Sequence, residues 1–147
     1  MAIPNTLLLA VCAFGEGMPA ERVAAALAKG VRASGMPEPD VCPIADDLPS
    51  GFDERMRRAR AVIVGAGRLD RETLASDRGS AGEVFEIATR ARQAGVPAYA
   101  VAGVNELDAF DARMLDLQVV LEANGTRGLT AAGRRLARLA YRCDETA

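Results

Sequence analysis

Residues 62–80 read VIVGAGRLDRETLASDRGS, and this stretch contains the unit from which the fold is predicted. A short apolar run, typical of a buried strand, leads into glycines, a polar stretch and a helix that we expect over residues 79–94. Four further short apolar runs alternate with helical patterns along the chain. The five expected strands cover residues 6–11, 41–45, 61–65, 98–102 and 118–122, and the other helices cover residues 19–34, 52–60, 108–115 and 129–142.

This alternation predicts an α/β fold: a doubly wound, mostly parallel five-stranded sheet with helices on both faces. The pattern leaves the strand order open between Rossmann-like and flavodoxin-like. A chain of 147 residues is long enough to bury a core, and it contains no linker, repeat or low-complexity tract. We therefore expect residues 1–147 to form a single domain.

The composition excludes several classes of function. With 20 acidic and 18 basic residues the net charge is -2, so we expect no nucleic-acid partner. The chain has no histidine and only one lysine, Lys29, which excludes Ser-His-Asp and Cys-His triads and His-ligated metals. Three cysteines without C-x-x-C spacing predict neither a disulfide framework nor a zinc site. Without a membrane-spanning run or a signal peptide, we expect a cytoplasmic protein with no membrane partner.

The loops after the strands are where an open α/β sheet binds ligands. Here they cover residues 12–18, 46–51, 65–79 and 103–108. In the third loop, Gly65 and Gly67 would let backbone N–H groups approach an anion, Arg68 supplies a positive charge, and Asp70 could take a proton or hold magnesium. The alternative interpretation is a strand-to-helix turn with a surface ion pair, because the residues match neither standard phosphate-binding motif.

Three other features have two interpretations each. Cys12 is either a reactive thiolate or a buried apolar side chain, and the absence of a neighbouring cation favours burial. The acidic group after the fourth strand, which comprises Glu106, Asp108 and Asp111, either binds a cation or is solvated. Arginines on the last helix either meet an anion or form a solvated face, and the second is the commoner case. These arginines are Arg134, Arg135, Arg138 and Arg142.

Two segments carry a more specific signal. Residues 7–46 combine an apolar strand, a loop centred on Phe14, the helix pattern Ala-Glu-x-Val-Ala-x-Ala-Leu-Ala-x-Gly and a strand ending Cys-Pro-Ile-Ala-Asp. Residues 59–103 contain Gly-Ala-Gly-Arg-Leu-Asp, then Thr-Leu, and later Ala-Gly-Val-Pro. Both segments resemble bacterial glycerate kinases, whereas the remainder is similar in layout only.

The resemblance implies ATP-dependent transfer of phosphate to the hydroxyl of glycerate, with magnesium as the accompanying ion. It places Arg68 and Asp70 at the catalytic position. It also implies nucleotide contacts by Gly65, Gly67, Arg78 and Phe14. Substrate contacts are implied for Asp46 and Thr73.

The chain departs from that family in two respects. A second domain that closes the family's cleft is missing, since only residues 47–59 separate the two similar segments. Charged signature residues of the family are also replaced. Cys12 occupies the position of an aspartate, Gly15 that of a lysine and Ala66 that of a glutamate. A later Gly-Lys pair is replaced by Ser-Asp. Because phosphoryl transfer depends on such charges, we expect a degenerate kinase that binds a nucleotide, phosphate or hydroxy acid weakly at most.

Two alternatives accompany this hypothesis. One is a non-catalytic interaction or oligomerisation domain, including half of a split kinase, whose partner covers apolar surface near Leu48, Phe52 and Leu69. The other is a true kinase in which a neighbouring subunit closes the site.

Overall fold

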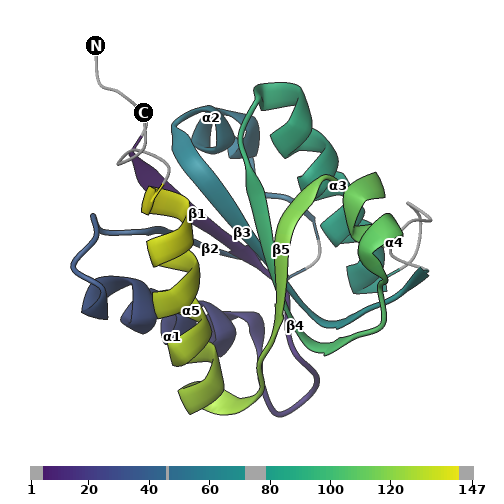
Figure 1. Ribbon diagram of the computed structural model, residues 1–147, viewed down its shortest axis with the longest axis horizontal. Coiled ribbons are helices and arrows are strands. Elements are labelled where there is room, and N and C mark those ends of the chain that lie inside the picture. Colours follow the sequence, from purple (N-terminus) through teal and green to yellow (C-terminus); the bar gives the residue numbers. More distant parts are fainter. Residues whose placement is uncertain (1–4, 46, 72–78, 143–147) are drawn as a thin grey trace.

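The computed structural model describes residues 5–45, 47–71 and 79–142, in which strands and helices alternate as the sequence predicts (Figure 1). The strands are β1 (Thr6–Val11), β2 (Asp40–Pro43), β3 (Ala59–Leu69), β4 (Ala98–Asn105) and β5 (Leu117–Glu122). The helices are α1 (Ala20–Ala33), α2 (Phe52–Arg57), α3 (Gly79–Ala94), α4 (Ala109–Met114) and α5 (Gly125–Arg142). None of the described helices is long and apolar enough to span a bilayer.

The five strands form one parallel sheet in the order β2-β1-β3-β4-β5. This is the flavodoxin-like order, which decides between the two that the sequence left open. The strand order reverses between β1 and β3, so the rule for open sheets places a ligand crevice beyond the carboxyl ends of these two strands.

The sheet is buried on both faces, as its apolar strands predict. Alternate side chains of β1 enter two separate cores: Leu7 and Leu9 pack with α1 and α5, whereas Leu8 and Ala10 pack with α2 and α3. The arrangement of helices on both faces of the sheet is therefore confirmed.

Two central strands are longer than predicted. The sequence places the end of the third strand at Gly65 and that of the fourth at Ala102, but β3 continues to Leu69 and β4 to Asn105. The extensions pair with each other, Arg68 with Val104 and Leu69 with Asn105. This pairing gives the backbone hydrogen-bond partners beyond the point where local glycines suggest a loop.

Helices α1 and α5 touch through two glycines. A Cβ atom added at Gly30 would collide with the carbonyl oxygen of Thr130, and one added at Gly133 would collide with that of Leu27. The helix backbones therefore lie closer together than any side chain would permit.

The apolar residues expected at a surface vacated by the second domain are not exposed. Phe52 and Leu69 are buried in the core and Leu48 packs against it, so this expectation is wrong. The reason is that α2 turns its apolar side chains toward α3 and β3. The large hydrophobic residues that are exposed among the described ones are Val104, which lies opposite Arg68 in the sheet, and Phe110 and Met114 on α4.

The glycine contact between α1 and α5 predicts opposite effects for two alanine substitutions in α5. Gly133→Ala should lower the free energy of unfolding by about 1–3 kcal/mol, because the added methyl group overpacks the interface. Gly128→Ala should raise it by about 0.5–1 kcal/mol, because an added Cβ there meets only Ala123, at an ordinary 3.8 Å, and alanine favours the helix. Urea denaturation of the two variants measures both values, and equal effects would contradict the close contact.

Candidate functional site

The segment that carries the candidate phosphate site is a strand over residues 65–69 rather than a loop. Gly65 pairs with Val101 and Ala66 with Ala102 in the parallel ladder, and the Gly65 carbonyl accepts from the Cys12 N–H at 2.9 Å. Backbone N–H groups in a strand point alternately to its two neighbours, so they do not converge on one anion as they do at a loop before a helix. The expected backbone cradle is therefore absent over these five residues.

The glycines of this region have a packing role. A Cβ on Gly65 would lie 2.9 Å from Val11 Cγ1, and one on Gly67 would lie 3.2 Å from the Phe14 Cα. On the neighbouring strand, a Cβ on Gly103 would lie 2.8 Å from the Gly67 carbonyl oxygen. Glycine is thus required here because other protein atoms approach the backbone closely.

The charge of Arg68 is matched by two carboxylates. Its guanidinium pairs with Asp70, with Nε 3.3 Å from Oδ2, and with the carboxylate of Glu106. The structure thus brings together the two residues that the resemblance places at the catalytic position, and it adds an acid from the end of β4. The group carries more negative than positive charge, which opposes phosphate binding at this point. It corresponds to the surface ion pair of the alternative interpretation, since the Arg68 side chain is 58% exposed.

Cys12 lies at the carboxyl end of β1 and is 2% exposed. Its thiol donates a hydrogen bond to Glu83 Oε2 on α3 at 3.1 Å. Burial, then this bond and the negative charge of Glu83, raise the pKa of the Cys12 thiol far above its ordinary range. Burial also raises the pKa of Cys42. The prediction that Cys12 is a buried apolar side chain is confirmed, but the sequence held no signal for Glu83, which is 71 residues away.

The remaining candidate site residues, Phe14 and the acidic group, have different structural roles. Phe14 packs against the α1/α5 core, and its N–H donates to the Met18 carbonyl in a tight turn. Asp108 and Asp111 cap the first turn of α4 by exchanging side-chain-to-backbone hydrogen bonds. Two members of the acidic group therefore have a capping role, and the third, Glu106, pairs with Arg68. No group of three possible metal ligands occurs in the described ranges.

Three residues implied by the resemblance lie outside the described ranges. They are Asp46, Thr73 and Arg78.

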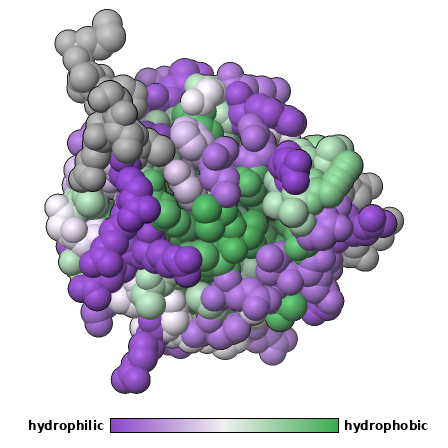
Figure 2. Space-filling model, in the orientation of Figure 1, coloured by the Kyte–Doolittle hydropathy of each residue, from purple (hydrophilic) through white to green (hydrophobic). Residues whose placement is uncertain are grey.

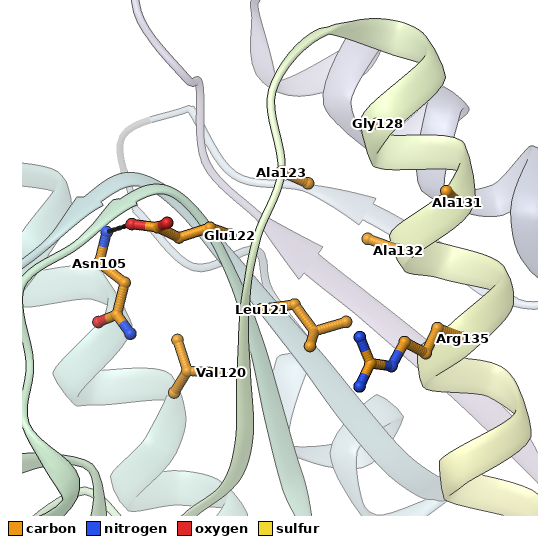
Figure 3. Close-up of a pocket in the computed structure, with 9 residues that line it drawn as sticks. All are labelled: Asn105, Val120, Leu121, Glu122, Ala123, Gly128, Ala131, Ala132 and Arg135. Carbon is orange, nitrogen blue, oxygen red and sulfur yellow. Dashed lines mark hydrogen bonds between the residues drawn. The ribbon is translucent and has the colours of Figure 1, made fainter.

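A groove of about 620 Å³ lies along β5, and no sequence pattern predicts it. We call it the β5 groove; its lining comprises Asn105, Val120, Leu121, Glu122, Ala123, Gly128, Ala131, Ala132 and Arg135. Figure 3 shows Val120 and Asn105 on one side of the strand, and Leu121 and Arg135 on the side of α5. The Asn105 N–H donates to Glu122 Oε2 at 2.8 Å, which holds that carboxylate against β4.

Comparison with known proteins identifies a family. Residues 49–140, more than half of the chain, match the family model of the glycerate kinase family. The match includes the segment over residues 59–103 and extends past it into α5. No curated protein sequence matches the chain.

Among solved structures, the chain is similar to a crystal structure of a 3-dehydroquinate dehydratase-like protein from Bifidobacterium longum. The identity is 12%, the TM-score is 0.49, and the alignment covers 91% of this chain and 95% of the other.

The raised pKa values of Cys12 and Cys42 predict that both thiols react slowly in the folded protein and that they make stability fall at high pH. In a Cys143→Ser background, Cys12 and Cys42 should react with an aromatic disulfide reagent at least about 100-fold more slowly in the folded protein than in guanidinium. Because the folded state binds these thiol protons more tightly, the contribution of the two thiols to the free energy of unfolding should be constant below pH 9.0 and fall above it. Cys12→Ala should remove part of that fall, and fast labelling of folded protein would contradict the assignment.

Proposed function

Because the chain belongs to the glycerate kinase family, we propose that it is a degenerate member that retains the α/β fold and transfers no phosphate. Its candidate site binds a nucleotide, phosphate or small hydroxy acid weakly at most. The observation that carries this proposal is the neutralisation of Arg68 by Asp70 and Glu106. Phosphoryl transfer requires uncompensated cations around the migrating group, whereas Asp70 and Glu106 carry two negative charges against the one positive charge of Arg68.

The replaced signature residues support the same proposal. Ala66 is fully buried in the core, so no charge projects from this position. Cys12 is a protonated, buried thiol and does not substitute for a carboxylate that holds a metal. Gly15 has a φ of 108°, a conformation that strains a lysine side chain at that position. The three changes are therefore accommodated by packing and backbone conformation.

The described residues include no group of three possible metal ligands, and Asp70, which follows the glycines of β3 in the sequence, is paired with Arg68.

Removing the two acids beside Arg68 should create anion affinity. Wild type should show no glycerate-dependent ADP release above background, and titration calorimetry should give millimolar or weaker binding of magnesium-ATP. The double substitution Asp70→Asn and Glu106→Gln should tighten phosphate binding about fivefold, which corresponds to a surface charge effect of about 1 kcal/mol. ADP release by wild type that Asp70→Asn abolishes would contradict the proposal and support a kinase with a site completed by another subunit.

The second candidate function is an interaction domain, either self-associating or part of a split kinase. Phe110 and Met114 favour it, because they lie four residues apart on α4 and are 57% and 56% exposed. Val104, at the end of β4, is 41% exposed. Large apolar side chains that are grouped on a surface commonly mark a contact with another protein.

If α4 is a contact surface, the double substitution Phe110→Ser and Met114→Ser should abolish association without loss of fold. Light scattering at increasing protein concentration measures the mass of wild type and variant, and circular dichroism verifies the fold. The matched control is Ala112→Ser, a change to the same residue on the same helix. A wild type that stays monomeric at millimolar concentration, and that recruits no partner through α4, would rule this surface out.

A further inference from the structure

We propose that the β5 groove binds an extended acidic peptide segment of a partner protein, which joins the sheet as a strand beside β5. This inference rests on the second candidate function and specifies the chemistry of the partner. It concerns the open edge of the sheet rather than the exposed side chains of α4.

The edge of β5 presents unused backbone groups. The Ala123 N–H donates to the Ala102 carbonyl of β4 at 2.9 Å, and successive residues of a strand point their backbone groups in opposite directions. The N–H and C=O groups of Val120 and Glu122 therefore point away from β4. Because β5 is the last strand of the sheet, no strand of the described chain lies on that side. Both residues line the groove.

The opposite edge of the sheet is protected in two ways. The Ile44 N–H donates to the Val11 carbonyl, so the backbone groups of Val41 and Pro43 point outward from β2. The Val41 carbonyl accepts a hydrogen bond from Arg55 at 3.1 Å, and Pro43 has no N–H to offer. Native proteins block edge strands by such devices, and an edge left without them is suited to strand addition.

The groove offers apolar contacts on both sides of its edge strand. Val120 and Leu121 project to opposite sides of β5, and Ala131 and Ala132 of α5 continue the surface on the side of Leu121 (Figure 3). Figure 2 shows this hydrophobic surface at the centre of the view, over β5, with hydrophilic surface around it. A peptide with alternating side chains fits both sides, because successive residues of a strand point to opposite faces.

The positive charge of α5 favours an acidic peptide segment. All five charged residues of α5 are arginines, and at 100° per residue they lie within a sector of about 100° on the exposed face of the helix. The set is Arg127, Arg134, Arg135, Arg138 and Arg142. Arg135 lines the groove, and no carboxylate of the described residues pairs with it. An acidic side chain of the peptide would supply the missing partner.

A second copy of this chain fits the edge less well. Pairing β5 with its copy about a two-fold axis would place the two α5 helices on the same face of the joined sheet. Both sets of arginines would then lie on one face of the dimer, with Arg135 of each copy lining the groove at the joined edges, and like charges on one face weaken association. A single peptide strand avoids this repulsion.

The test begins with a phage-displayed library of random dodecapeptides selected on the wild-type protein. We expect enrichment of sequences in which apolar and acidic residues alternate. A fluorescein-labelled peptide with the enriched sequence should bind in an anisotropy titration and shift the backbone amide resonances of residues 117–123. Binding should weaken at least about tenfold with Arg135→Glu, which removes a charge-assisted contact.

Two further variants separate this edge from nonspecific attraction. Val120→Pro removes an N–H that points away from β4, so it breaks no hydrogen bond between β4 and β5. It should also weaken peptide binding about tenfold, while the melting temperature stays close to that of the wild type. Arg138→Glu makes the same charge change one turn away, outside the groove lining, and should change affinity by less than about threefold.

Three results would overturn the inference. They are no enriched peptide family, equal binding by wild type and Val120→Pro, and a concentration-dependent dimer that Val120→Pro dissociates, which would assign the edge to a second copy. The last result would leave the interaction function in place. The absence of peptide binding would refute this inference alone, and both would be refuted only if the protein also stayed monomeric and recruited no partner through α4.

Discussion

The contact between the backbones of α1 and α5 determines the position of one whole helix layer. Gly30 and Gly133 let the two helices meet without intervening side chains, so α5 cannot rotate or shift without a collision. The apolar side of α5, with Leu129 and Leu136, is thereby held on the sheet, and its arginines face outward. The distance between α5 and β5, and with it the shape of the β5 groove, follows from the same contact.

The distribution of charge at the carboxyl ends of the strands is the second feature on which the candidate site depends. In this region the positive charge of Arg68 is neutralised by two neighbouring carboxylates, those of Asp70 and Glu106. The basic residues are instead concentrated on α1 and α5, which hold eight of the 18 bases and one of the 20 acids. The helix layer formed by α1 and α5 therefore carries a strong excess of positive charge, whereas Arg68 at the strand ends is paired with acids.

The sequence was sufficient for the fold class because the relevant signals are local. The first strand was predicted to the residue, since its apolar run is bounded by polar or small residues on both sides. The end of β3 was missed because Gly65 and Gly67 resemble a loop locally, and the pairing that extends the strand comes from β4, more than 30 residues later. The same limit applies to the site. Burial of Cys12 followed from its neighbours, but contacts of Cys12 with Glu83 and of Arg68 with Glu106 arise only in the folded chain.

The unequal edges of the sheet limit how large an assembly it can form. A sheet with two receptive edges can join head to tail without end, as in fibres. Here the proline and the capped carbonyl of β2 close one side, so an added strand on β5 ends the growth of the sheet. The sheet can thus accept one added strand at β5 without forming a continuous polymer through backbone hydrogen bonds.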